Sequence, residues 1–360
     1  MDRANLALAR FLATTGNAVT LVTHRADTEL AGFANVTLQR VARPWGRHQL
    51  GALGLDRRAR KCARAAAAGT RVVSNGGNFL WGDVNWVHFV HAAANPGPSP
   101  HNWYRRWQQQ HDRRRERMAL GGAQLVIANS ERTRRDLIAH VGVSPERIQV
   151  VYYGSDPGEF YPPTSQESAA LRQELDLAAD RPTVGFIGAL GDDRKGFDTL
   201  FDAWGPFAAA TGAVLLVIGS GSRLPQWRAR AQAQGLDAHL RFLGFRADVP
   251  RLMRTLDLVV APTRYEAYGL AVHEAWCCDV PVVVSRQAGV AERCPESLQE
   301  LLLDNPQDAV ELQQRLWAWW RHRSSFQLAS RELGAKLRAI TWDDMAREMV
   351  ATITAHPPAV

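Results

Sequence analysis

The sequence predicts an α/β protein with two doubly wound domains, each a parallel sheet covered by helices on both faces. Short apolar runs alternate with helix-like segments along the whole chain. Most of these runs lack the polar alternation of half-exposed strands, as expected for parallel strands buried on both faces. The length of 360 residues suits two domains of roughly 150 residues each.

The first domain is expected to cover residues 1–160. Its strands and helices alternate at the spacing typical of a parallel sheet. Strands are predicted at residues 18–23, 36–41, 71–74, 85–91, 123–128 and 148–152, and helices at 2–14, 49–68, 102–120 and 131–140.

The chain begins inside the first of these helices, without a preceding strand or glycine loop. In a doubly wound sheet that first strand is usually central. Its absence would leave two neighbouring strands without a partner and their backbone groups unsatisfied. We therefore expect Met1 to be an internal methionine of a longer natural chain, which peptides upstream of Met1 in the native protein would demonstrate.

A change of character between residues 155 and 182 marks the domain boundary, because four prolines there flank a polar helical stretch. The second domain, expected at 161–340, restarts the alternation, and a closing helix follows within 341–360. Its ligand crevice should lie at the carboxyl ends of its strands. These strands are predicted at residues 184–188, 214–219, 240–244, 256–261 and 281–285, with helices starting near 197, 224 and 310.

The composition indicates in which cellular compartment the protein works and which partners it lacks. The net charge is +7 and the pI about 9.6, carried almost wholly by arginine. This bias favours a GC-rich genome over nucleic-acid binding, so we expect no nucleic-acid partner. The four cysteines show no metal-ligand spacing and fit a reducing compartment. No apolar run approaches the ~18 residues of a membrane span and no signal-peptide pattern is visible, so we expect a cytoplasmic protein.

Two carboxylates, Glu266 and Glu274, stand on either side of a glycine that opens a helix. The stretch follows the predicted strand at 256–261, and the first amides of a helix in that position attract phosphates. Carboxylates are poor phosphate ligands, so the pair indicates a ligand with hydroxyls beside its phosphates, such as a nucleotide sugar. The plainer interpretation is a pair of surface carboxylates near a helix N-terminus, where negative charge is favoured by about 0.3–1 kcal/mol.

Two more loops follow strands of the same domain. In the loop after the strand at 184–188, Arg194 and Lys195 stand directly before Gly196. The planar guanidinium of an arginine can bind two phosphate oxygens, and the ammonium of a lysine attracts them as a compact charge. A glycine-serine loop at 219–222 follows another strand. Each loop alone is explained as a solvated turn. Loops after parallel strands face one crevice, so their convergence favours a phosphate-bearing ligand.

From about residue 150 to residue 292 the chain resembles the family-four retaining glycosyltransferases of the GT-B fold, in which two Rossmann-like domains face each other across a cleft. The likeness is ordered across the second domain and looser in the first, around residues 86–91 and 126–130. The matching segments are Val150–Asp156, Phe186–Gly188, Arg194–Gly196, Leu216–Gly221, Phe242–Phe245, Ala261–Thr263, Glu266–Glu274 and Pro281–Glu292. The tail around Thr341 is similar to the family's final helix, which crosses back to the first domain.

The resemblance implies a role for each matching position. Glu274 would accept hydrogen bonds from the donor's ribose hydroxyls, and Lys195, with Arg194, would neutralise the leaving diphosphate. Glu266 would contact the donor sugar, and His91 of the first domain would face that sugar across the cleft; for His91 a satisfied core histidine is the plainer interpretation. The other donor-binding positions implied are Gly188, then Gly269, Leu270 and Ala271 at the distal phosphate, then Phe245 and Arg246 at the base.

The implied reaction moves a sugar from a nucleotide-sugar donor to an acceptor that is lipid-linked, a glycan or a small molecule. Because the configuration is retained, the leaving phosphate itself can act as the base. No carboxylate nucleophile, no metal and no other cofactor is then expected. Two alternatives remain open: a nucleotide-sugar hydrolase or epimerase on the same fold, and a catalytically impaired scaffold that binds nucleotide.

Two features bear on these expectations. Family members often carry an arginine directly after the glycine that ends the second domain's first strand, and this chain has Ala189 there, so Arg194 would substitute. The helix at 102–120 carries six arginines, with Trp103 and Trp107 on one face. Such a helix can lie on an anionic membrane, which would suit a lipid-linked acceptor. A solvated helix that packs its tryptophans on the sheet explains the pattern equally well.

Overall fold

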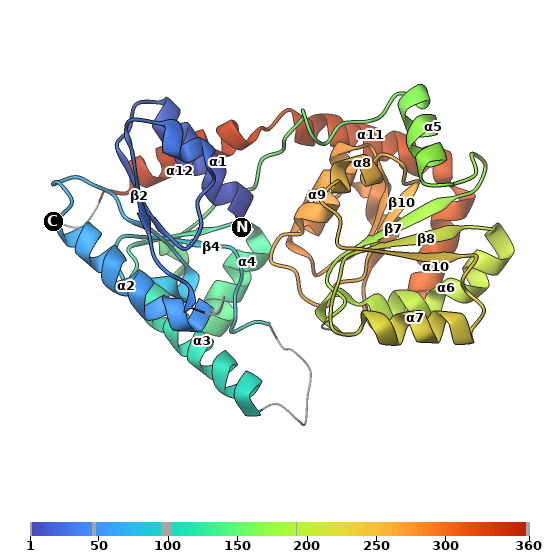
Figure 1. Ribbon diagram of the computed structural model, residues 1–360, viewed down its shortest axis with the longest axis horizontal. Coiled ribbons are helices and arrows are strands. Elements are labelled where there is room, and N and C mark those ends of the chain that lie inside the picture. The colour runs from blue at the N-terminus through green and yellow to red at the C-terminus, as the bar shows by residue number, and fades with distance from the viewer. Residues whose placement is uncertain (1, 45–47, 95–102, 192, 358–360) are drawn as a thin grey trace. The chain divides into compact units, whose positions relative to one another are not determined.

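The computed structural model describes residues 2–44, 48–94, 103–191 and 193–357, and the chain forms two α/β units (Figure 1). The first unit combines the chain up to Gly154 with the segment from Trp342 onward, and the second runs from Ser155 to Thr341. The division falls before the proline-rich segment, whereas the sequence placed it at residue 160. Ser155 and Thr341, at the two crossings, form a parallel bridge, and the Ser155 amide donates to the Ile340 carbonyl at 2.9 Å.

The second unit is built on a continuous six-stranded parallel sheet with the order β12-β11-β10-β7-β8-β9. Its first strand along the chain, β7, therefore lies in the interior of the sheet. Every residue of β8 and β11 is buried, as is nearly all of β7, which accounts for their continuous apolar composition. The strands are β7 (Thr183–Ile187), β8 (Val214–Ile218), β9 (Leu240–Gly244), β10 (Leu258–Ala261), β11 (Val282–Ser285) and β12 (Leu302–Leu303).

Helices cover both faces of this sheet, with α6, α7 and α10 on one side and α8, α9 and α11 on the other (Figure 1). Helix α10 packs on α6, where the rings of Trp317, Trp319 and Trp320 surround Phe207. The bounds are α5 (Ser165–Glu174), α6 (Phe197–Thr211), α7 (Leu224–Ala233), α8 (Val249–Met253), α9 (Leu270–Cys277), α10 (Ala309–Arg321) and α11 (Arg323–Arg338).

The first unit contains two separate parallel sheets in its described residues, a four-stranded sheet with the order β3-β4-β5-β6 and a pair β1-β2. Among the described residues β1 and β3 thus each have a single strand partner. The strands β4 and β5 are buried throughout, whereas no residue of β1 is buried. The bounds are β1 (Val19–Thr23), β2 (Val36–Arg40), β3 (Val73–Asn75), β4 (Val84–Val87), β5 (Leu125–Ala128) and β6 (Ile148–Val150).

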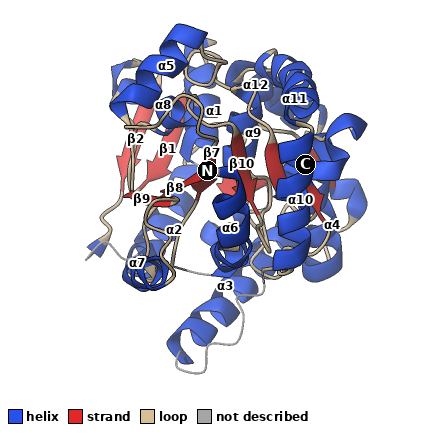
Figure 2. Ribbon diagram, turned by 90° about the vertical axis from the view of Figure 1, so that its right-hand side faces the viewer, coloured by secondary structure: helices blue, strands red, loops and turns tan. Residues whose placement is uncertain are grey.

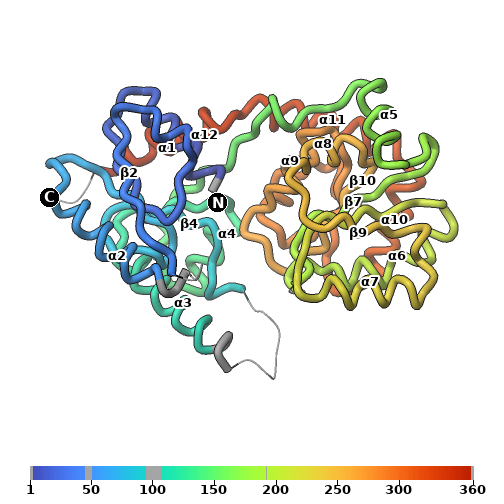
Figure 3. The backbone as a smooth tube through the Cα atoms, viewed as in Figure 1, coloured from blue at the N-terminus to red at the C-terminus, as the bar shows by residue number. Residues whose placement is uncertain are grey.

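The helices of the first unit include the two that lie nearest the chain ends. Helices α1 and α12 pack side by side, as the dark blue and red parts of the tube show (Figure 3). Coloured by secondary structure, the strands of the molecule lie among helices (Figure 2). The bounds are α1 (Asp2–Thr14), α2 (His48–Arg64), α3 (Trp103–Gly122), α4 (Glu131–Asp136) and α12 (Trp342–Ala355). None of the helices in the described residues combines the length and apolar character needed to cross a bilayer.

Two sequence predictions were wrong in detail, and helices α8 and α11 were not predicted. The strand expected to reach residue 91 ends at Val87, because the following segment turns away and its amides bind a helix instead of a neighbouring strand. The helix expected at 131–140 keeps α-geometry only to Asp136 and continues as a wider π-turn that ends at Gly142, whose φ is 84°.

Candidate functional site

The strand order of the second unit places a switch point between β7 and β10. From β7 the chain moves outward to β8 and β9 on one side, and from β10 it moves to β11 and β12 on the other. In open α/β sheets, ligands bind outside the carboxyl ends of the strands at such a point. The loops that follow β7 and β10 are the ones that carry Lys195 and Glu266.

These two loops meet in a cluster of two cations and one carboxylate. The Lys195 ammonium donates to Oε2 of Glu266, and an Arg194 guanidinium nitrogen lies 3.6 Å from the same oxygen. Arg194 also donates to the Tyr265 carbonyl at 3.2 Å. The three charged side chains are only 24%, 29% and 18% exposed for Lys195, Arg194 and Glu266, so solvent screens them weakly. One net positive charge remains in the cluster.

Arg264, which the sequence reasoning missed, fastens the two loops together. Its amide donates to the Arg194 carbonyl at 2.8 Å, and its guanidinium donates to the Asp193 carbonyl at 2.9 Å and to the Asp198 carboxylate at 2.5 Å. The backbone that carries Lys195 is therefore held to the backbone that carries Glu266. A cation in a strand-end loop could have been noted in the sequence, but its partners are not visible there.

The third loop, after β8, packs backbone to backbone against the first. Gly219 has φ 147°, and a Cβ at this position would lie 1.9 Å from the Gly188 carbonyl oxygen. Asp193 in the first loop forms an ion pair with Arg223 at the start of α7. This pair was also missed, because its members stand 30 positions apart. The predicted position Gly188 thus lies at the packed junction of two loops, and its own Cβ would contact the Lys195 side chain at 3.3 Å.

The N-terminus of α9 completes the arrangement. Gly269 precedes the helix with φ 116°, a conformation that favours glycine. The amides of Leu270 and Ala271 are the first two of the helix and lack partners within it. The loop after β11 supports this helix start, since the Gly289 amide donates to the Glu266 carbonyl at 3.0 Å. Three predicted elements, the cations, Glu266 and the helix start, therefore meet at one edge of the sheet.

Beneath the helix start lies a buried histidine. The Nδ1 atom of His273 and the Tyr268 hydroxyl are 2.7 Å apart. Burial lowers the pKa of His273 to about 3, with a smaller contribution from Arg293. His273 is therefore neutral in ordinary buffers and has a structural role below the predicted phosphate site.

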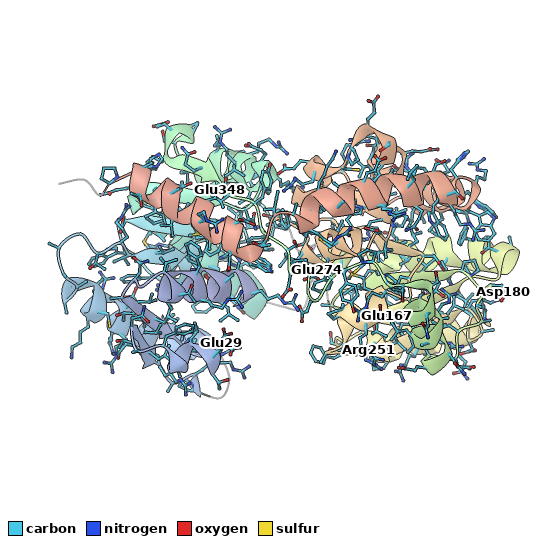
Figure 4. All side chains as sticks on the ribbon, turned by 90° about the horizontal axis from the view of Figure 1, so that it is seen from above. Glu29, Glu167, Asp180, Arg251, Glu274 and Glu348 are labelled. Carbon is cyan, nitrogen blue, oxygen red and sulfur yellow. The ribbon has the colours of Figure 1, made fainter. Side chains whose placement is uncertain are left out.

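The remaining predicted positions of this unit are less enclosed. Glu274 projects from α9 and is half-buried (Figure 4). Phe245, after β9, is 80% exposed. Arg246 forms two hydrogen bonds to Asp248, at 2.7 Å and 2.5 Å, which lower the pKa of that carboxyl. Arg246 is therefore already paired with a carboxylate that the sequence reasoning did not consider.

In the first unit, His91 is exposed on a turn after β4 and is not the satisfied core histidine of the plainer interpretation. The inward-facing histidine is His88, which is half-buried. Its Nε2 lies 2.9 Å from the Asn75 side-chain oxygen and its Nδ1 contacts the Tyr153 hydroxyl. Burial lowers the pKa of His88 to about 3, so this side chain is a neutral part of the core.

Family models match both halves of the chain. Residues 1–159 match the model described as Glycosyltransferase Family 4, and residues 181–321 match the model described as Glycosyl transferases group 1. The chain belongs to these glycosyltransferases. Within this family the chain has the GT-B fold of two Rossmann-like domains.

Individual glycosyltransferases agree with this assignment. A D-inositol 3-phosphate glycosyltransferase from Jonesia denitrificans is 29% identical over 240 residues, which cover 63% of this chain and 55% of the relative. A 2-deoxystreptamine N-acetyl-D-glucosaminyltransferase from Streptomyces fradiae is 30% identical over 171 residues, which cover 46% of this chain and 40% of the relative. The matched region thus spans about half the length of these curated relatives.

Solved structures of glycosyltransferases share the fold. A sucrose-phosphate synthase from Thermosynechococcus elongatus superposes with a TM-score of 0.79 at 20% identity, covering 97% of this chain and 91% of the other. The Anabaena protein HepE in complex with UDP and glucose superposes with a TM-score of 0.71 at 20% identity, covering 98% and 96%. At this identity the likeness concerns the fold.

Proposed function

We propose that the protein is a retaining glycosyltransferase whose second unit holds a nucleotide-sugar donor. The observation that carries this proposal is the cluster of Lys195, Arg194 and Glu266 at the switch point between β7 and β10. Two cations and a helix N-terminus form a suitable site for a diphosphate, and family membership supplies the reaction class.

The charges of this cluster support exchange of one anion for another. In the structure Glu266 forms an ion pair with Lys195. A diphosphate carries more negative charge than one carboxylate, so it would take Lys195 and Arg194 as ligands and release Glu266 toward the donor sugar. Fixed cations and helix amides stabilise the departing diphosphate without reorganising during the reaction.

The other predicted positions take roles around this centre in the proposal. Glu274 accepts hydrogen bonds from the ribose, and the amides near Gly269, Leu270 and Ala271 hold the distal phosphate. Phe245 offers an exposed ring beside the nucleotide base. Arg246 also lies beside the base in this proposal, while it keeps its ion pair with Asp248. The Anabaena HepE complexes hold UDP or UDP-glucose, so uridine nucleotides are the first probes to use.

Retention of configuration is proposed to proceed with the leaving phosphate as the base for the acceptor. His91 of the first unit is assigned to the donor sugar. The protein's own cations provide the positive charge, so no metal is required in this proposal. Turnover that stays constant in EDTA, and does not rise when Mg²⁺ or Mn²⁺ is added, is the expected result; activity abolished by the chelator and restored by one metal would contradict it.

Thermal unfolding with UDP, GDP, ADP and TDP tests the donor site directly. A nucleotide at about one hundred times its dissociation constant stabilises the folded chain by roughly 2.7 kcal/mol, and one of the four should raise the midpoint. Lys195→Met should abolish the shift, whereas the matched change Lys336→Met, at an exposed position of α11, should preserve it. Cooperative unfolding with no shift from any nucleotide would overturn the donor assignment.

Affinity for the same nucleotide tests Glu274. Replacement by alanine should weaken binding by about 1.5–3 kcal/mol, as for the loss of a charged hydrogen-bond acceptor. Calorimetric titration measures this difference. Unchanged affinity would remove Glu274 from the site.

A peripheral contact with anionic membrane is part of the proposal for a lipid-linked acceptor. Trp107 of α3 is 55% exposed and Arg114 is also exposed. Arg113 and Arg115 are not available as expected, because they donate to backbone carbonyls of the first unit. The side chains of Trp103, Arg105 and Arg106 lie outside the described part. Co-sedimentation with vesicles containing anionic lipid is expected, and an absence of binding would exclude the contact.

A further inference from the structure

A buried carboxylate from helix α3 holds the turn that carries His91. Glu116 is 0% exposed. Its Oε1 accepts from the His91 amide at 2.9 Å, and its Oε2 accepts from the Ala92 amide at 3.0 Å. Both oxygens of one carboxylate are thus used on two consecutive backbone amides that follow β4.

Arg113, one helical turn earlier on α3, holds the carbonyl side of the same segment. Its Nε donates to the His91 carbonyl at 3.1 Å, and its terminal nitrogen donates to the Ala94 carbonyl at 3.0 Å. The anion therefore binds N–H groups and the cation binds C=O groups, as the hydrogen-bonding capacity of each side chain requires. No strand or helix ladder in the described residues satisfies these backbone groups, so α3 takes that place.

Burying this carboxylate is costly. Burial raises the pKa of Glu116, while the two backbone amides and the charges of His91 and Arg113 act in the opposite direction. A buried charge is retained in a fold where it is hydrogen-bonded and paired. A helix that only covered the sheet would need neither Glu116 nor Arg113, because an apolar residue would pack there at lower cost.

The result is a turn with a fixed backbone and an exposed side chain. The His91 ring lies in solvent, and its one described ring contact is edge-on to Phe89 at 5.0 Å between centroids. His88, by contrast, has both ring nitrogens engaged in the core. The segment between these two histidines thus changes from core to surface, at the carboxyl edge of the sheet where α/β proteins place ligand-binding groups.

We propose that Glu116, assisted by Arg113, is a positioning residue that fixes the turn after β4 and so holds the His91 imidazole in place for sugar transfer. This rests on the proposed function, in which His91 meets the donor sugar. The hydrogen bonds recorded for Glu116 in the described residues go to the His91 and Ala92 backbone amides, and its charge interacts with His91, so in this proposal Glu116 acts through His91.

Backbone amide measurements test the hydrogen bonds without any substrate. In protein labelled with ¹⁵N-histidine and ¹⁵N-alanine, the His91 and Ala92 amide signals should move in Glu116→Gln. Hydrogen exchange of at least one of the two amides should accelerate by about tenfold or more, since an amide side chain has one acceptor oxygen where the carboxylate has two. Asp112→Asn, a surface acid on the same helix, is the matched control and should leave both signals unchanged. Unaltered His91 and Ala92 signals in Glu116→Gln would overturn the proposal.

Turnover measures the consequence for the reaction. With UDP-glucose as the probe and UDP release as the signal, kcat should fall about tenfold in Glu116→Gln and about a hundredfold in Glu116→Ala, the scale of a small misplacement of a reacting group. The affinity for UDP should change by less than twofold, because the residues assigned to the nucleotide belong to the second unit. If Glu116 had a merely structural role, its replacement would lower the folded fraction of the protein. It would not lower kcat while the affinity for UDP stays the same.

A double variant shows whether Glu116 acts through His91. His91→Ala combined with Glu116→Gln should be no slower than His91→Ala alone, because the ring that Glu116 positions is already gone. Fully multiplicative losses would overturn the positioning role. If His91→Ala itself leaves turnover unchanged, the role proposed for His91 in sugar transfer fails, whereas the amide signals still decide whether Glu116 holds the turn.

Discussion

The two units of the molecule place similar strands in different surroundings. The strand β1 reads Val-Thr-Leu-Val-Thr and β8 reads Val-Leu-Leu-Val-Ile, yet every residue of β8 is buried and none of β1 is. β8 lies between β7 and β9 in a continuous sheet, whereas β1 pairs with β2 alone among the described residues. Composition therefore identifies both as strands, and their neighbours in the sheet decide how far they are buried.

The two units also differ in how the loops at their strand ends are held in place. In the second unit, loops from neighbouring strands are held by backbone packing and by charged pairs that surround Lys195. In the first unit, buried and half-buried polar side chains perform this task. The side-chain amide of Asn129 donates to the Tyr153 hydroxyl at 3.1 Å. The same hydroxyl contacts Nδ1 of His88, and Nε2 of His88 lies 2.9 Å from the side-chain oxygen of Asn75. The strand ends of the first unit are thus held by a network of neutral polar side chains, and those of the second unit by loop packing and ion pairs.

The largest expected effect strikes the second unit at its loop junction. Gly219→Ala would place a methyl carbon 1.9 Å from the Gly188 carbonyl oxygen, and backbone cannot give way as a side chain does. We expect a loss of more than about 4 kcal/mol, or no folded second unit. The control is Gly212→Ala, where φ is 71° but nothing lies within 4 Å, at a cost of about 1–2 kcal/mol. Urea unfolding measures both; equal effects would show that the loops are not tightly packed.

Acid should weaken both units over the same range of pH. The pKa values of His88 and His273 are both lowered to about 3 by burial, so below about 6.5 the unfolded chain binds protons that the folded chain does not. The contribution of these two histidines to stability is therefore constant above about pH 6.5 and falls with decreasing pH between about 6.5 and 3, by about 1.4 kcal/mol per pH unit for each histidine.

Unfolding at a series of pH values checks this slope. His88→Gln and His273→Gln should each flatten it in their own unit, and the exposed His322→Gln should not. A slope that survives both substitutions would assign the acid sensitivity to other groups.

A matched pair of valines tests the comparison between strands. Val184→Ala in β7 removes two buried methyl groups and should cost about 2–3 kcal/mol through lost transfer energy and a cavity. Val22→Ala in β1 removes half-exposed methyls and should cost less than about 1 kcal/mol. Hydrogen exchange read separately in the two units resolves the two effects. Similar costs would mean that β1 is as well covered as β7.

Helix caps should show no difference between the units, because a cap acts within one helix. Ser130 accepts from the Thr133 amide at the start of α4, and Asp308 accepts from the Val310 and Glu311 amides at the start of α10. Either residue replaced by alanine should cost about 1 kcal/mol. A cost several times larger at Ser130 would show that the buried polar groups of the first unit depend on this cap.

The sequence predicted most elements of both units because local patterns determine them. The apolar runs and the switch from strand to helix placed β7, β8 and β10 with their loops, and hence Lys195 and Glu266. Contacts between distant positions were not predictable in the same way. The order of residues shows neither that Lys195 pairs with Glu266 nor that Arg246 pairs with Asp248. The early end of β4 likewise depends on Glu116, which comes from a helix later in the chain.

The bridge between Ser155 and Thr341 has a consequence for how such a protein can be altered. The two points at which the chain enters and leaves the second unit lie side by side, so the stretch from 155 to 341 is an insertion with adjacent ends. Recombination could exchange residues 155–341 between relatives as one segment, and the path of the chain through the first unit would stay the same. Combining the first unit of one relative with the second unit of another would then require only two joints, both at the same place.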